Sequence, residues 1–187
     1  MTDTLRVLTV RQPWAGAIVH LGKDVENRPQ RWAYRGPVLI HAALYNPMYI
    51  PDHTSVCRIA FPGAEYWSFD FCQERGQIIA ITEIVDCVDH TDGHGWTIPW
   101  MQGDSHYLVS PWYIEGQFGY VLRNTQPITP TLYTGGLGLR RFRHELSSDV
   151  GLATQIYQWA DANDYYLAED YGDNTVHWTR KDSEARP

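Results

Sequence analysis

Residues 77–88 read QIIAITEIVDCV, a long stretch with the composition of a β-strand. β-Branched side chains dominate it, and such side chains fit the pleated, half-buried surface of a sheet. Glu83 stands in the middle of this stretch, on the face that alternation shares with Ile79, Ile81 and Val85. A carboxylate within an apolar stripe must be paired or protonated, because an isolated buried charge is costly. The stretch therefore predicts a long strand that carries either a functional acid or a buried salt bridge with an arginine.

Shorter apolar runs on both sides of this strand predict a sheet with few helices. Pro13 and Gly22 suit the beginning and the end of a short amphipathic helix. Residues 149–164 carry apolar side chains at helical spacing, which predicts a terminal helix. Further strands are expected at 5–10, 38–43, 118–123 and 137–142, and a further helix from Pro51 to about residue 60. Short strands joined by varied loops predict an α+β fold, a small mixed β-barrel with flanking helices.

The composition is that of a globular domain. The chain has 187 residues, which is long enough to bury a core. Its residues are 43% hydrophobic and 20% charged, and this composition excludes wholesale disorder. No stretch approaches the roughly 18 apolar residues of a membrane span, and no signal peptide is evident, so we expect no membrane contact. Three cysteines without metal-like spacing argue against a disulfide framework and favour a reduced, cytoplasmic protein.

The distribution of charge is more informative than its sum. A net charge of −7 argues against a protein that coats polyanions generally. Residues 5–41, however, carry six cations against two acids. Lys23 and Lys181 are the only lysines in the chain, and every other cation is an arginine. The arginine fork suits recognition of phosphate or carboxylate, so the N-terminal segment predicts a local anion site.

Several separated blocks resemble the ASCH domain (activating signal cointegrator homology), whose members belong to the PUA-like superfamily of small β-barrels. The blocks occur in the family's order from about residue 5 to residue 143. They are LTVRQPWA at 8–15, GKDVENR at 22–28, YRGPVLIHA at 34–42, GQIIAITEIVDC at 76–87, SPW at 110–112, GYVLRN at 119–124 and GLGL at 136–139. The resemblance implies an ASCH domain over residues 1–145. Residues 146–187 would add the terminal helix and a tail that is mobile beyond about residue 172.

The resemblance also implies what the domain binds. ASCH domains are expected to bind RNA, DNA or nucleoside-like ligands in a cleft beside the barrel, without a cofactor. Some small bacterial members resemble amidohydrolases that act on acylated cytidine, and others have been linked to ribonuclease activity. The primary hypothesis is therefore a nucleic-acid- or nucleotide-binding protein with a cationic cleft, and the alternative is a hydrolase.

The expected binding residues come from the first two motif blocks and the loop after them. Backbone N–H groups at the helix start near Pro13 favour an anion beside Arg11. Arg28 and Arg35 have an alternative role, in which they pair with Asp24, Glu26 or Glu83 and only fix the loop. Trp14 has the alternative of the buried helix face, whereas the polar loop beyond residue 28 supplies candidates for stacking on a base. The full set is Arg11, Gln12, Trp14, Lys23, Arg28, Trp32, Tyr34 and Arg35.

The candidate catalytic residues are Lys23, Glu83 and Glu26. Lys23 follows the helix-ending glycine and is expected to overhang the cleft, where a lowered pKa would make it a base. Hydrolase-like members carry a threonine nucleophile three residues after this lysine, and here that position is Glu26. A glutamate is a poorer nucleophile and would pair with Lys23, raising the pKa of the lysine. This departure favours binding over catalysis.

No metal site is expected. His90 and His94 are spaced like ligands on a helix, but Gly93 and Gly95 make a helix there improbable. His106 lies in the same glycine-rich segment. His41 stands in an apolar strand and is expected to be a hydrogen-bonded core histidine.

Overall fold

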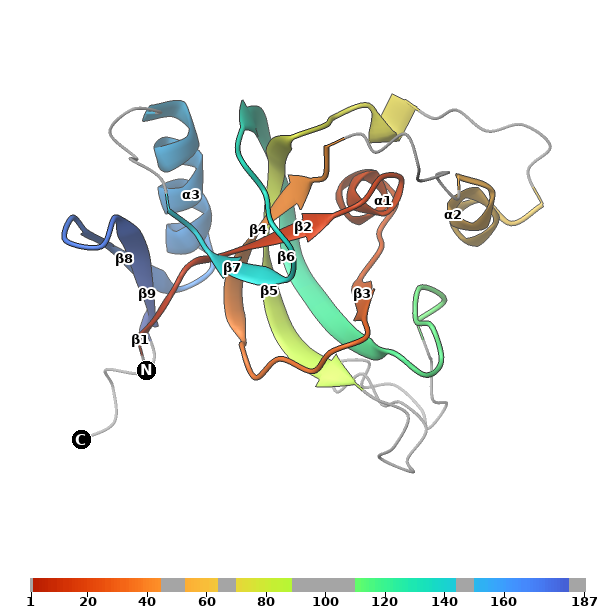
Figure 1. Ribbon diagram of the computed structural model, residues 1–187, viewed down its shortest axis with the longest axis horizontal. Coiled ribbons are helices and arrows are strands. Elements are labelled where there is room, and N and C mark those ends of the chain that lie inside the picture. Colours follow the sequence, from red (N-terminus) through yellow and green to blue (C-terminus); the bar gives the residue numbers. More distant parts are fainter. Residues whose placement is uncertain (1, 45–52, 64–69, 89–109, 144–149, 182–187) are drawn as a thin grey trace.

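A curled six-stranded sheet forms the centre of the molecule (Figure 1). The computed structural model describes residues 2–44, 53–63, 70–88, 110–143 and 150–181. Strand order in the sheet is β3-β6-β5-β4-β2-β7, with β2 parallel to β4 and the other pairs antiparallel. In chain order these strands are β2 (Arg6–Val10), β3 (Val25–Arg28), β4 (Gly36–Ala42), β5 (Gln77–Val88), β6 (Phe118–Leu132) and β7 (Leu139–Arg141).

The remaining elements flank this half-barrel on two sides. A second, three-stranded sheet has the order β1-β9-β8. Figure 1 shows α3 with β8 and β9 at one side of the half-barrel, and α1 with α2 at the other. Their bounds are β1 (Thr2–Thr4), α1 (Trp14–His20), α2 (His53–Ala60), the 3-10 turn η1 (Asp70–Cys72), α3 (Val150–Ala162), β8 (Tyr165–Asp170) and β9 (Thr175–Arg180). This mixed architecture confirms the expected α+β, PUA-like fold. Within the described ranges no helix has the length and apolar character needed to cross a bilayer.

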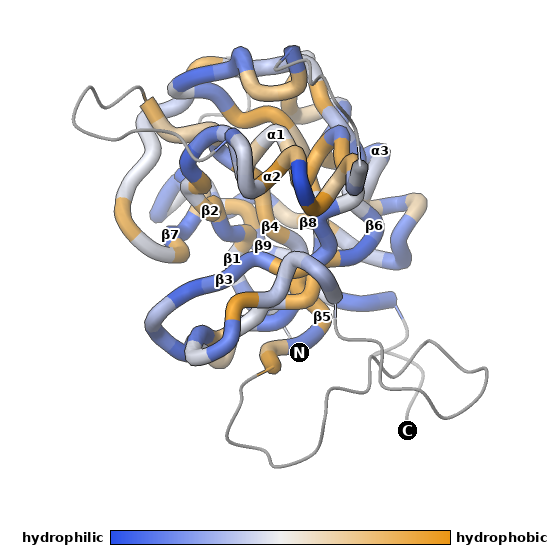
Figure 2. The backbone as a smooth tube through the Cα atoms, turned by 90° about the vertical axis from the view of Figure 1, so that its right-hand side faces the viewer, coloured by the Kyte–Doolittle hydropathy of each residue, from blue (hydrophilic) through white to orange (hydrophobic). Residues whose placement is uncertain are grey.

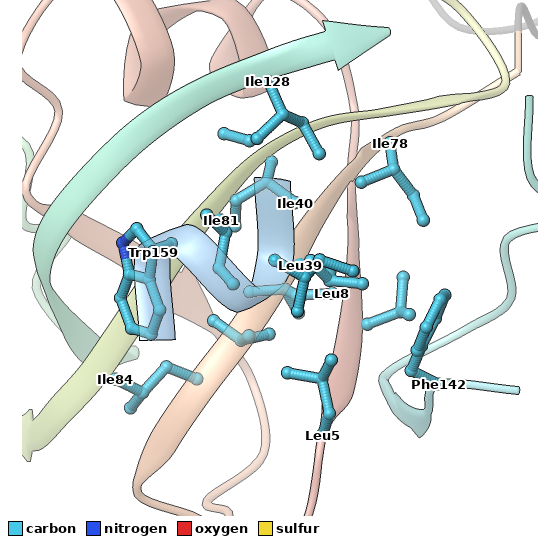
Figure 3. Close-up of a cluster of buried hydrophobic side chains, with 14 of the residues drawn as sticks. Leu5, Leu8, Leu39, Ile40, Ile78, Ile81, Ile84, Ile128, Phe142 and Trp159 are labelled. Carbon is cyan, nitrogen blue, oxygen red and sulfur yellow. The ribbon is translucent and has the colours of Figure 1, made fainter. Parts of the chain in front are cut away.

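The core lies between the half-barrel and α3 (Figure 3). Hydrophobic stretches of the chain run through the inner strands, as the tube in Figure 2 shows. Ile81 and Ile84 of β5 are about 1% exposed, and Trp159 of α3 is equally buried in the same cluster. Each such side chain contributes about 1.5–3 kcal/mol when it leaves water. The apolar face predicted for the terminal helix is therefore the face that packs on the sheet.

Strand β6 continues to residue 132, beyond the predicted end at residue 123. The sequence NTQP after Arg123 is typical of a turn, which explains the short prediction. Asn124 does adopt a positive φ of 54°, but the chain resumes pairing with β5. Strand β3 covers only residues 118–121 of β6, so the later part of β6 is a sheet edge on that side. An edge tolerates Pro127, which has no N–H to donate.

Residues 175–180 form a strand in the part of the chain where the sequence predicted a mobile tail. Strand β9 spans residues 175–180 and pairs with both β1 and β8. Val176 is 1% exposed, and Trp178 donates from Nε1 to the Tyr34 hydroxyl at 3.0 Å. Gly36, at a φ of +136°, leaves the space that this indole fills, since a Cβ there would stand 2.2 Å from the ring. The contacts of β9 with β1, Tyr34 and Gly36 join residues more than a hundred positions apart, so the local sequence pattern did not reveal them.

Glu83 is the polar link between the half-barrel and the C-terminal strands. Its carboxylate accepts from the Tyr165 hydroxyl at 2.6 Å and pairs with Arg180. It is 6% exposed, so the structure gives the salt-bridge reading of this residue. Burial raises the pKa of Tyr165, and the hydrogen bond to the Glu83 carboxylate raises it further.

Removing the arginine should weaken the fold. We expect Arg180→Ala to lower the free energy of unfolding by about 1–3 kcal/mol, because Glu83 would stay buried without its cation. The Arg180 side chain is itself 45% exposed, which limits the loss. Lys181→Ala, next in the chain, removes a solvent-exposed pair with Asp161 and should change little. Urea unfolding of both variants measures the difference, and equal stabilities would contradict this role for Glu83.

Candidate functional site

A cleft of about 690 Å³ opens beside β2 and α1. Segments far apart in the sequence meet in it, including both of the first two motif blocks. Among the residues that the structure describes, its charged lining consists of four cations and one carboxylate. The lining residues are Thr9–Gln12, Trp14, Lys23, Glu26–Pro29, His41, Ala43, Leu44, Arg75, Ile114, Gln117 and Thr134–Gly138.

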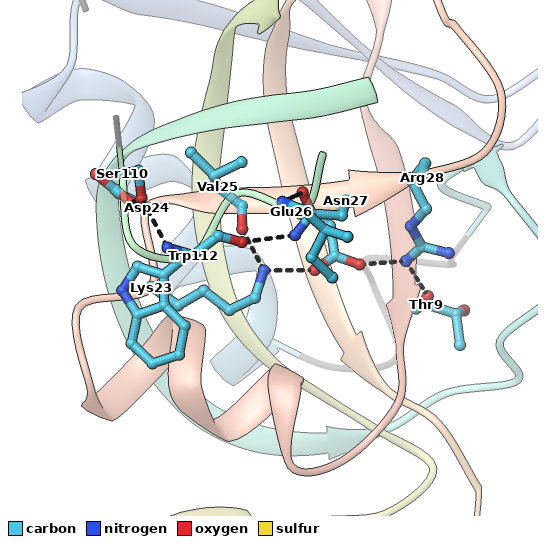
Figure 4. Close-up of polar contacts among 10 residues, drawn as sticks. Thr9, Lys23, Asp24, Val25, Glu26, Asn27, Arg28, Ser110 and Trp112 are labelled. Atoms are coloured by element: carbon cyan, nitrogen blue, oxygen red, sulfur yellow. Dashed lines mark hydrogen bonds and ion pairs between the residues drawn. The ribbon is translucent and has the colours of Figure 1, made fainter. Parts of the chain in front are cut away.

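A row of charges forms the polar floor of this cleft (Figure 4). Glu26 accepts from Lys23 Nζ at 2.8 Å on one carboxylate oxygen and from Arg28 at 3.0 Å on the other. Arg28 also donates to the carbonyl of Thr9 at 2.7 Å, which ties β3 to the end of β2. Lys23 donates in addition to the carbonyl of Val25. Both oxygens of the acid are thus occupied by cations.

Local sequence explains how these charges come to face inward. Gly22, at a φ of +68°, lets the chain leave α1 and turn directly into β3. Alternation along β3 then sends Val25 to a small apolar cluster around Trp112 and turns Glu26 to the opposite face. Lys23 is only 2% exposed, so it does not overhang the cleft as the sequence suggested. Its aliphatic stem is buried and its ammonium reaches the floor.

The pKa values of this pair follow from burial and from the balance of charge. Burial lowers the pKa of Lys23 more than its partner Glu26 raises it. For Glu26, burial works in the opposite direction, but Lys23 and Arg28 together outweigh it and hold the pKa below its ordinary value. The carboxylate is therefore ionised at neutral pH, and Lys23 is an amine whose proton is held more weakly than usual.

The helix start at α1 does not offer the free backbone N–H groups that were expected to bind an anion beside Arg11. The N–H of Ala15 donates to the carbonyl of Arg11, and the N–H of Gly16 donates to the side chain of Gln12 at 2.9 Å. These helix-start groups are consequently engaged within the chain and do not point to an anion. Arg11 itself is exposed at the cleft, and Trp14 lies half-buried with Lys23 Nζ 5.9 Å from its ring centroid.

Three expected binding residues stand outside the cleft lining. Tyr34 is buried, and its hydroxyl donates to the carbonyl of Pro37. Arg35 donates to the carbonyls of residues 32 and 34 and so fixes the loop. Trp32 stacks on Tyr120, with the ring centroids 4.9 Å apart. The alternative in which Arg35 fixes the loop was open in the sequence, whereas nothing in the sequence indicated that Trp32 packs on β6 or that Tyr34 is buried.

Glu83, placed with Lys23 in the candidate catalytic set, is likewise not a lining residue of the cleft. Its partners Tyr165, Arg180 and Asn124 are also absent from that lining. Of the catalytic candidates, the structure brings together only Lys23 and Glu26.

Two lining features were missed by the sequence analysis. Arg75 donates to the main-chain carbonyls of Cys72 and Glu74, next to the beginning of β5. The loop Thr134–Gly138 forms one wall, where Gly135 packs against His41 so closely that a Cβ would stand 2.2 Å from the imidazole. The GLGL block gave a partial signal for this wall, whereas nothing distinguished Arg75 from other arginines.

His41 is a buried, hydrogen-bonded histidine, as its place in an apolar strand predicted. Its Nδ1 lies 3.2 Å from the Thr9 hydroxyl and its Nε2 lies 3.0 Å from the carbonyl of Tyr133. Burial lowers its pKa, which favours the neutral imidazole. The histidines considered for a metal site, at positions 90, 94 and 106, lie outside the described residues. Elsewhere Asp170, Asp173 and His177 have ligand atoms within 4.8 Å of one another on the β8–β9 hairpin, where Arg141 and Thr175 contact Asp173.

The floor should make stability depend on pH. Because the pKa of Glu26 is below 4.5 in the folded chain, the ion pairs stabilise the fold above about pH 4.5 and lose this effect as the pH falls through the folded pKa. We expect Glu26→Gln to cost about 3 kcal/mol at neutral pH, with the difference from wild type shrinking in acid. Urea unfolding between pH 3 and pH 7 measures it.

The matched control is Asp86→Asn, which alters a half-exposed acid that pairs with Arg35 at 3.8 Å. This variant should stay within about 0.5 kcal/mol of wild type, as exposed pairs contribute little. A Glu26→Gln difference that does not vary with pH would contradict the ionised floor.

Comparison with known families agrees with the motif blocks. The family model described as the ASCH domain matches residues 8–129, which is more than half of the chain and runs from within β2 to most of β6. No match is found among curated proteins. Membership of this family suggests RNA binding or a related function. The chain belongs to the ASCH domain family.

Proposed function

We propose that this protein binds a nucleic acid or a nucleotide in the cleft beside β2 and α1. The observation that carries the proposal is the charge of the lining, four cations around a single, already neutralised carboxylate, in a protein of net charge −7. A cleft of one sign in an oppositely charged molecule concentrates ligands of the opposite sign. Its volume of about 690 Å³ lies within the range of small-ligand sites.

In this proposal the ion pairs of the floor and the other two arginines of the lining have different roles. Lys23 and Arg28 offset the charge of Glu26 and hold the shape of the floor. Arg75 bonds to main-chain carbonyls, which leave its positive charge intact. With Arg11 exposed nearby, the positive potential of these two arginines extends to the mouth, where phosphate oxygens would meet guanidinium forks.

The proposal predicts a loss of salt-dependent binding in one variant. Arg11→Ala should weaken the affinity for a labelled oligonucleotide, because a phosphate contact is removed. The slope of log affinity against log salt concentration should fall in magnitude by about 0.7–0.9. Arg58→Ala removes an exposed arginine of α2 outside the cleft lining and should leave the slope unchanged. Fluorescence anisotropy across a salt series gives both slopes; equal slopes for wild type and Arg11→Ala would remove this arginine from the site.

Hydrolysis in the same cleft is the second candidate, and one observation favours it. Lys23 combines burial, a lowered pKa and a place in the cleft lining, as a catalytic base does. Its ammonium, however, is engaged by Glu26, and Glu83 serves the C-terminal strands instead. Incubation with N-acetylated cytidine and with RNA tests this candidate: turnover by wild type that disappears in Lys23→Met would establish it in place of simple binding.

A further inference from the structure

The cleft lining includes exposed apolar side chains besides its charged groups. Leu44 is 73% exposed, Ile114 is 45% exposed and Leu137 is 91% exposed, and all three are lining residues of the cleft. We call these three side chains the apolar rim. They come from three separate segments, which follow β4, precede β6 and precede β7. Their convergence on one cleft distinguishes them from scattered surface leucines, which are ordinary.

The most exposed member of the rim is held by a fixed backbone. The N–H of Gly136 donates to the Thr9 hydroxyl at 3.2 Å, and the carbonyl of Leu137 accepts from Arg140 at 3.4 Å. Gly135 packs against His41 without room for a side chain. The loop is therefore anchored on both sides of Leu137, and its apolar side chain is presented to solvent at a defined place.

The other two members are also positioned by contacts. Leu44 lies over Gly76, where an added Cβ would stand 2.7 Å from a methyl group of the leucine. The N–H of Ile114 donates to the Asn27 side chain at 2.9 Å, and Asn27 is itself a lining residue beside the charged floor. Rim and floor are thus parts of one framework.

This combination specifies a ligand with flat apolar faces and a negative charge. We infer that the cleft takes an unpaired nucleotide of a single-stranded nucleic acid, with the base against the apolar rim and the phosphates near the arginines. In a duplex the faces of the bases are stacked on their neighbours and are not accessible to leucine or isoleucine side chains, whereas an unpaired base exposes both faces. The inference rests on the proposed function and narrows it from nucleic acids in general to single strands.

An apolar rim is also typical of a surface that binds another protein, but the positive charge of the lining favours a nucleotide. An apolar protein contact gains nothing from the four cations of the lining, whereas each phosphate of a strand does. The single strand accounts for both features with one ligand, so we argue this occupant and let the experiment decide between the two.

The experiment compares strandedness and rim variants in the full chain. Labelled single-stranded RNA and DNA oligonucleotides of about ten residues, and blunt duplexes of the same sequences, are titrated by fluorescence anisotropy. We expect the single strands to bind at least about tenfold more tightly than the duplexes. Leu137→Ala should weaken single-strand binding by about fivefold, because the truncation removes apolar area that the base would cover, without changing the salt slope. Comparing RNA with DNA identifies which polymer is preferred.

Leu132→Ala is the matched control, because Leu132 is 78% exposed and is not a lining residue. It should bind like wild type. Equal affinity for single strand and duplex, with the salt dependence retained, would overturn this inference and leave the proposed function standing. Unchanged binding by Leu137→Ala would do the same, because it would remove the apolar rim from the nucleotide site. Failure of every probe to bind would overturn the proposed function and this inference together.

Discussion

The carboxylate of Glu26, held between Lys23 and Arg28, is the constraint on which the cleft depends. An unpaired charge at this depth would be costly, so each of the three side chains requires the others. Their contacts also continue outward, since Arg28 reaches the carbonyl of Thr9 and the hydroxyl of Thr9 meets the glycine-rich wall. A continuous polar framework thus runs from the floor to the loop that carries the apolar rim, and the shape of the cleft follows from charge pairing as much as from packing.

Local patterns predicted the elements whose character is local. The strand at 77–88 and the helix of residues 150–162 were recognisable because their periodicity is set by neighbours in the chain. The β8–β9 hairpin was missed although its pairing is local, around the turn at residues 171–174. The burial of Val176 and Trp178, in contrast, depends on partners from distant segments. The same limit applied to Glu83, where the sequence gave a salt bridge with an arginine as one reading but did not say which arginine, since Arg180 lies 97 residues away.

The candidate site was predicted in outline, and its finer arrangement was not. The motif blocks drew attention to Arg11, Lys23 and Arg28, and these residues do share the cleft. Spacing alone did not reveal that Lys23 is buried, because the turn at Gly22 directs it inward. Trp32 packs on Tyr120 of β6, Tyr34 bonds to the carbonyl of Pro37 in β4, and Arg35 bonds to carbonyls of its own loop. Both the stacking of Trp32 and the burial of Tyr34 depend on three-dimensional neighbours. Arg75 and the rim became evident only when separate segments were placed together.

The pairing of β1 with β9 makes the order of synthesis matter. Thr2 lies opposite Thr179, 177 residues further along the chain. At about 5–20 residues per second, roughly 10–35 s separate the emergence of these two strands from the ribosome. Once β7 has emerged, all six strands of the central sheet have been made, while Glu83 still lacks Arg180 and the hollow at Gly36 still lacks its indole. The nascent chain therefore passes through a stage with an unclosed flank, during which protection from aggregation must come from outside the molecule.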